Sequence, residues 1–137
     1  MPGAERIARW RRLATAAAKQ SLVPRALELH DAAPLADLIE SLAKDRLAGG
    51  AGEAAPLKMI CTMGAEPIAS VIQRTRPRGI VIACGPEGDF TEVEVQLAKG
   101  AGFVAAGLGN SRLRSETAAI AAVSIAAALR DEFRGAD

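Results

Sequence analysis

Hydrophobic residues recur at helical spacing in the first part of the chain. They lie three or four positions apart, at Ile7, Trp10, Leu13, Ala14 and Ala17. This spacing predicts an amphipathic helix over residues 4–20. A second helical pattern covers 33–48, with Pro34 near its expected first turn. Between the two, the short run ALEL at 26–29 predicts a strand.

From residue 56 onward, short apolar runs alternate with helical patterns. The runs predict strands over 56–62, 79–84 and 103–108, and the intervening patterns predict helices over 67–75, 91–101 and 115–133. Thr91 followed by Glu94 forms a capping-box pattern at one helix start. Strands that alternate with helices indicate a parallel sheet with helices on both faces. We therefore expect an α/β fold, formed as a single domain over residues 1–137.

The expected strand ends are followed by turns rich in glycine and charge. The turns read CTMGAEP (61–67), GPEGDFT (85–91) and GLGNSRLRSET (107–117). In parallel sheets, ligands bind beyond the carboxyl ends of the strands, and glycine lets the backbone approach them closely. For each turn alone, the alternative is that glycine only makes a tight connection.

The side chains of these turns narrow the class of ligand. The chain contains neither GxxxxGK[ST] nor GxGxxG. Glu87 and Asp89 would repel a triphosphate in the absence of a metal ion. Leu108 and Leu113 suit the two faces of a flat base, and charges of both signs follow at 112–116. The turns therefore favour a nucleoside-like cofactor beside an anionic polymer.

The composition excludes some classes of protein but does not identify a binding partner. The 17 basic and 16 acidic residues nearly cancel, but residues 1–25 are strongly basic, which suits either phosphates or a solvated helix face. Cys61 and Cys84 each end an apolar run and are interpreted as reduced, buried thiols. The missing CxxC spacing and spare histidines disfavour a disulfide or a metal pair. The N-terminus lacks an apolar signal core, and the apolar stretch 118–129 is too short to span a bilayer. We expect a cytoplasmic location, with no membrane association and no metal.

Two of these turns together resemble a known family. The stretches GPEGDFTEVE and LGNSRLRSET resemble the signatures of the RsmE family of SPOUT RNA methyltransferases, and AAAKQS at 16–21 resembles the end of a helix in that family. The resemblance implies methylation of N3 of a uridine in small-subunit ribosomal RNA, with S-adenosyl-L-methionine as the cofactor. It also implies a homodimer and a trefoil knot near the C-terminus, a rare exception to unknotted topology.

The resemblance also assigns residues to roles. It places the cofactor against eight positions: Cys61, Thr62, Gly85, Glu87, Gly88, Leu108, Gly109 and Leu113. Arg112 and Arg114 are expected to bind RNA. Arg114 is also expected to stabilise negative charge that develops on the base, and Glu116 to accept a proton or hold Arg114. The alternative for Glu116 is an acid that only stabilises a helix N-terminus.

The sequence departs from the family pattern at several points. Asp89 stands where a glycine is usual, and Ser111 stands where bacterial members often carry arginine. The family's N-terminal RNA-binding β-barrel is expected to be absent. Two other functions therefore stay open, namely an inactive RNA-binding homologue and a small nucleotide-binding regulatory domain. We expect the dimer to bury part of the helix at 115–133, because that segment is apolar around most of its circumference.

Overall fold

The computed structural model describes residues 3–21, 27–48, 55–87 and 89–134, and its contacts divide the chain into two units. The first unit, Met1–Pro34, contains α1 (Ala4–Gln20), which confirms the predicted helix. The Arg11 guanidinium donates to the Leu29 carbonyl at 3.2 Å and to Asp31 Oδ1 at 3.0 Å, so it holds the segment after the helix.

The strand predicted at 26–29 is wrong for its described residues 27–29, which form neither strand nor helix. Leu27 is 70% exposed. A strand is stabilised by hydrogen bonds to a neighbouring strand, and the described part of this unit offers none. Two apolar residues at alternate positions therefore do not suffice. Residue 26 lies outside the described residues.

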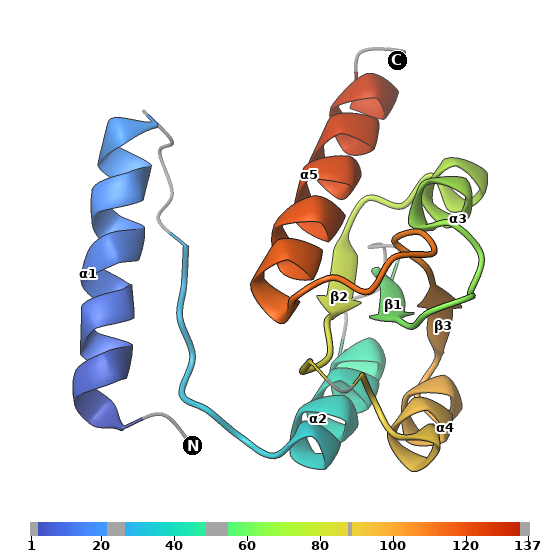
Figure 1. Cartoon of the computed structure of the whole chain (residues 1–137), viewed down its shortest axis with the longest axis horizontal. Helices are drawn as coiled ribbons and strands as arrows, with labels where there is room; N and C mark the ends of the chain where they lie inside the picture. The colour runs from blue at the N-terminus through green and yellow to red at the C-terminus, as the bar shows by residue number, and fades with distance from the viewer. Residues whose placement is uncertain (1–2, 22–26, 49–54, 88, 135–137) are drawn as a thin grey trace. The chain divides into compact units, whose positions relative to one another are not determined.

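The second unit, Leu35–Asp137, is built on a parallel sheet (Figure 1). It contains β1 (Leu57–Cys61), β2 (Ile80–Ala83) and β3 (Phe103–Ala106), in the spatial order β2-β1-β3. Ile60 on β1 pairs with Ala83 on β2 and with Ala105 on β3. The predicted strands and their parallel arrangement are confirmed. The central strand β1 is the most deeply buried of them.

Helices cover both faces of the sheet, as the alternation predicted. On one face, α3 (Ile68–Thr75) and α5 (Ser115–Arg134) pack over Met59 and Cys61. On the other face, α2 (Leu35–Ala48) and α4 (Glu92–Gly100) pack over Ile60. Alternate side chains of a strand point to opposite faces, which explains how successive residues of β1 enter two separate cores.

One lysine is buried in the second of these cores. Lys58 is 5% exposed, and its ammonium donates to the carbonyl of Ala101 at 2.7 Å and to that of Leu42 at 3.4 Å. The ammonium also lies 5.5 Å from the centre of the Phe103 ring. A buried charge is costly unless it is paired or hydrogen-bonded, so these contacts explain why a lysine is tolerated on the central strand.

The helix boundaries follow local chemistry. At α4 the predicted capping box is confirmed, because Glu94 N donates to Thr91 Oγ1 at 3.3 Å and Thr91 N donates to Glu94 Oε2 at 2.8 Å. Pro34 directly precedes α2, where its missing amide donor costs nothing. Among the described helices, none combines the length and the apolar character that a bilayer span requires.

The segment after β3 crosses the turn after β1 at very short range. Gly107 N donates to the Glu66 carbonyl at 2.7 Å, and Ile68 N donates to the Gly107 carbonyl at 2.9 Å. A Cβ at position 107 would lie 2.6 Å from the carbonyl oxygen of Ala65. Only glycine fits this crossing without displacing backbone. In Figure 1 the chain then runs back along the carboxyl edge of the sheet to α5.

Candidate functional site

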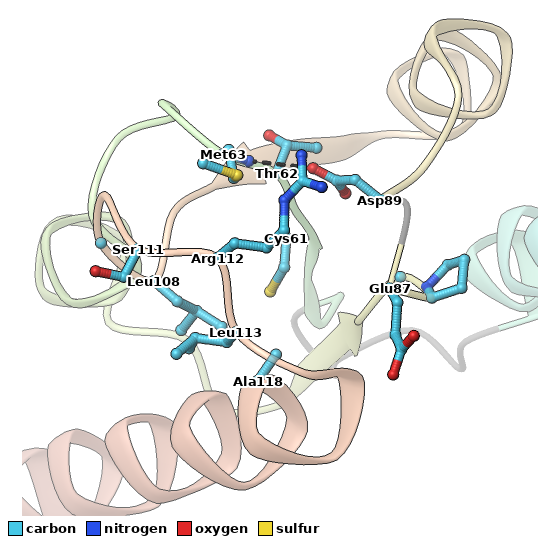
Figure 2. A pocket seen from close by; sticks show the side chains of 13 residues that line it. Cys61, Thr62, Met63, Glu87, Asp89, Leu108, Ser111, Arg112, Leu113 and Ala118 are labelled. Carbon is cyan, nitrogen blue, oxygen red and sulfur yellow. Dashed lines mark hydrogen bonds between the residues drawn. The ribbon is translucent and has the colours of Figure 1, made fainter.

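The carboxyl edge of the sheet carries an open hollow, formed where the turns after all three strands meet. The wall comes from the three turns and the first part of α5, and consists of Cys61, Thr62, Met63, Gly85, Pro86, Glu87, Asp89, Leu108, Gly109, Ser111, Arg112, Leu113 and Ala118. Segments far apart in sequence thus form a single concave surface (Figure 2).

The structure brings together most residues that the sequence assigned to a cofactor. Seven of the eight line this hollow: Cys61, Thr62, Gly85, Glu87, Leu108, Gly109 and Leu113. The eighth, Gly88, lies outside the described residues. Arg112, expected to bind RNA, also lines the wall. The identity of the ligand stays a prediction.

The two expected catalytic residues lie at the beginning of α5, next to the wall rather than in it. Arg114 is exposed, and its carbonyl accepts from Ala118 N at 2.8 Å, which closes the first turn of the helix. Glu116 is exposed in that same first turn. Its position is compatible with both roles considered for it, proton acceptor and helix-stabilising acid.

Several wall residues were not assigned to the site from sequence, namely Met63, Pro86, Asp89, Ser111 and Ala118. Asp89 is the most informative. It has φ 67°, a left-handed backbone that glycine adopts most easily, and Asn and Asp more readily than other residues. Its Oδ1 accepts from Phe90 N at 2.8 Å, and its Oδ2 accepts from Met63 N at 3.4 Å. The carboxylate therefore links the turns after β1 and β2, a contact for which the sequence alone carried no signal.

The wall is chemically two-sided. Leu108, Leu113 and Ala118 form an apolar part beside α5, whereas Thr62 and Asp89 lie on the other side (Figure 2). In this view the Arg112 side chain extends toward that polar part, and the Glu87 carboxylate points away from it. A ligand with one flat apolar end and one polar or cationic end would match both parts.

Glycine conformation supports close access to the hollow. Gly109 has φ 114°, and a Cβ built on it would meet no atom within 4 Å. The backbone is therefore open toward the hollow and takes a conformation that other residues adopt only with strain. Gly85 is tighter, since a Cβ there would lie 3.2 Å from the Phe90 ring.

The two cysteines lie side by side, with Cys61 in the wall of the hollow and Cys84 directly before the wall residue Gly85. Both are free, as expected, and their sulfurs are 3.9 Å apart. A hydrogen bond from Cys61 lowers the pKa of Cys84 to about 7, although burial partly opposes that shift. The pKa of Cys61 is raised, because its proton is held by Cys84 and because it is buried. Among the described residues, no group of three or more His, Cys, Asp or Glu is arranged to hold a metal ion.

Comparison with known proteins identifies relatives that match most of the chain. A family model described as an RNA methyltransferase domain matches residues 2–127. Ribosomal RNA small subunit methyltransferase E of Bacillus subtilis is 31% identical over 132 residues, which cover 93% of this chain and 48% of that protein. The protein of the same name from Synechocystis is 31% identical over 90% of this chain and 39% of its own length.

A solved structure is similar in both sequence and fold. The crystal structure of ribosomal RNA small subunit methyltransferase E from Neisseria gonorrhoeae, bound to S-adenosyl methionine, superposes with a TM-score of 0.70 at 30% identity. The match covers 90% of this chain and 47% of that one. The chain thus spans about half the length of the relatives it matches, and the resemblance found in its two turns is confirmed.

Proposed function

Because this chain belongs to the family of RNA methyltransferase domains, we propose that it transfers a methyl group from S-adenosyl-L-methionine to ribosomal RNA of the small subunit. The base is proposed to be a uridine, methylated at N3. One observation carries the proposal: the two signature turns lie in a single hollow at the carboxyl edge of a parallel sheet. The cofactor bound to the similar Neisseria protein supports the same assignment.

The wall of the hollow fits the proposed cofactor. Leu108 and Leu113 offer apolar surface to an adenine ring, and Gly109 leaves its backbone open to close approach. The carboxylate of Asp89 lies in the polar part of the wall, where it favours the positively charged end of the molecule, and Glu87 also lines the wall. When bound, S-adenosyl-L-methionine supplies an already activated methyl group, so the protein has mainly to orient it.

The catalytic contribution is proposed to come from the segment before α5. Uridine N3 carries a proton at neutral pH and becomes nucleophilic only when that proton leaves. Arg114 is exposed beside the hollow, where its guanidinium can stabilise the negative charge that develops on the base. Glu116 is exposed two residues further on and accepts the proton or orients Arg114.

RNA is proposed to approach over exposed basic side chains. Arg112 lines the hollow and Arg114 borders it, so both can meet the polymer next to the target base. In the other unit, α1 has no buried residue and carries Arg6, Arg9, Arg12 and Lys19 on its exposed surface. Phosphate contacts of this kind supply much of the affinity for nucleic acids without reading sequence.

Two features of topology and assembly extend the proposal. The crossing of Gly107 against Ala65 and Glu66 supports a knotted path, in which 107–137 threads through a loop made by preceding residues. A homodimer is supported by α5, whose Ile120 and Val123 are 68% and 60% exposed. Large exposed apolar side chains one helical turn apart are typical of surfaces that bind another protein.

The decisive test is incorporation of labelled methyl into small ribosomal subunits that lack the modification, followed by nucleoside analysis. We expect label in N3-methyluridine, and methyl on another base would overturn the substrate. Calorimetry with S-adenosyl-L-methionine and with ATP distinguishes the alternatives. Binding of ATP alone would indicate a nucleotide-binding regulatory domain, and RNA binding without methyl transfer would indicate an inactive homologue.

A further inference from the structure

Cys61 and Cys84 are neighbours across two strands of the sheet. Cys61 is the last residue of β1, and Cys84 directly follows the last residue of β2. Each therefore comes one position after the paired residues Ile60 and Ala83. Their sulfurs are 3.9 Å apart, and both thiols are free. Because the two strands form a hydrogen-bonded ladder up to this point, the fold places the two cysteines opposite each other and their side chains within reach of one another.

The surroundings isolate the pair but leave it within reach of small molecules. Both cysteines belong to the apolar core on the α3 and α5 face of the sheet, where they pack with Met59 and Leu108. Cys61 is 8% exposed, and it also forms part of the wall of the open hollow. Cys84 is half-buried. A small oxidant can therefore reach the pair through the open hollow.

The two thiols also differ in pKa. The S–H of Cys61 donates to the sulfur of Cys84 once that group is ionised, which lowers the pKa of Cys84 to about 7 and raises the pKa of Cys61. The thiolate is the nucleophilic form of cysteine, so Cys84 is the sulfur prepared to attack and Cys61 is its resolving partner.

We propose that Cys61 and Cys84 form a reversible dithiol–disulfide site beside the hollow, with Cys61 in its wall and Cys84 next to the wall residue Gly85. The Cys84 thiolate attacks one oxygen of hydrogen peroxide, the O–O bond breaks, and Cys84 becomes a sulfenic acid as the other oxygen leaves and takes a proton. The Cys61 sulfur then displaces hydroxide from Cys84, the S–S bond forms, and the Cys61 proton leaves as part of water. Two thiols are oxidised and one peroxide is reduced to two waters. A dithiol reductant reverses the change.

Oxidation has a structural consequence for the wall. A disulfide bond is about 2.05 Å long, so the sulfurs must approach each other from 3.9 Å. Thr62 follows one cysteine and Gly85 follows the other, and both line the hollow. We therefore expect the bond to draw the bases of the two turns toward each other. The effect on the cofactor rests on the proposed function, whereas formation of the disulfide does not.

The chemistry is tested on the full chain by intact mass and peptide mapping. After one equivalent of hydrogen peroxide, free thiols are alkylated in denaturant and the chain is digested with trypsin. We expect a cross-link between peptides 59–74 and 79–99, with loss of both free thiols and recovery after dithiothreitol. Cys84→Ala should give no cross-link. Persistence of two alkylated thiols in the wild-type chain, or a disulfide between two chains, would overturn the site.

The functional consequence is tested in the same samples. We expect the oxidised chain to lose methyl transfer on the order of a hundredfold, since displacement by about 1 Å can cost that much, and to regain it after reduction. Cys84→Ala should be insensitive to the same treatment, which also controls for oxidation of Met63, a half-exposed wall residue. Unchanged methyl transfer by a fully cross-linked chain would show that the disulfide does not affect cofactor binding or the reaction. A reduced wild-type chain without any methyl transfer activity would contradict the proposed function. The disulfide site would then be decided by the peptide mapping alone.

Discussion

At the scale of single residues, Gly109 is the position where one side chain should exclude the ligand. We expect Gly109→Val to lose measurable binding of S-adenosyl-L-methionine in calorimetry, because the branched side chain would project into the hollow from an open backbone. Gly102→Val is the matched control, since Gly102 also has a left-handed backbone, φ 85°, but lies outside the hollow. Wild-type affinity in a folded Gly109→Val chain would refute the assignment of this turn.

Arg114 is the residue whose loss should affect the reaction more than cofactor binding. Arg114→Ala is expected to slow methyl transfer on the order of a hundredfold, because a contact to developing charge is typically worth about 3 kcal/mol. Arg114→Lys should recover activity only in part, since lysine lacks the planar fork of donors. The cofactor affinity of both variants should match wild type, as Arg114 lies outside the wall. Full activity of Arg114→Ala would contradict the proposed role of Arg114 but would leave the proposed substrate unchanged.

At the scale of elements, the turn after β2 is held in place by the start of α4. Thr91→Ala should lower the free energy of unfolding by about 1 kcal/mol, because it removes the acceptor of the Glu94 amide and half of the capping box. Denaturant titration measures the loss, and Thr91→Ser, which keeps the hydroxyl, should restore most of it. An unchanged midpoint in Thr91→Ala would mean that the cap does not contribute to stability.

The elements themselves were largely predictable from sequence. The spacing of hydrophobic residues and the chemistry of helix caps are local properties. The strands β1, β2 and β3 and the capping box at Thr91 could therefore be predicted from neighbouring residues. The strand expected at 26–29 failed, because pairing depends on residues elsewhere in the chain. The same limit applies to the site. Glycine-rich turns indicated the hollow, but the carboxylate of Asp89 bridging to Met63 and the contact between two cysteines from separate strands are products of the tertiary fold.

At the scale of the whole molecule, the exposed side of α5 decides whether two copies associate. Ile120→Glu and Val123→Glu should each shift the proposed dimer to monomer in sedimentation at micromolar concentration, because a buried unpaired charge costs several kcal/mol. Gln96→Glu, on the exposed side of α4, is the control and should leave the association state unchanged. A wild-type chain that is only monomeric under these conditions would contradict the homodimer.

The burial of Lys58 on the central strand allows opening of the core to be followed by chemical modification of its amine. Its amine is enclosed by two carbonyl oxygens and an aromatic ring, whereas Lys19, Lys44 and Lys99 are exposed. An acylating reagent should therefore modify the three exposed amines at once and reach Lys58 only when the sheet opens. The rate of that last modification, followed by mass spectrometry, gives the frequency with which the native core exchanges with open states. Labelling of Lys58 as fast as that of Lys99 would mean that the core does not protect it.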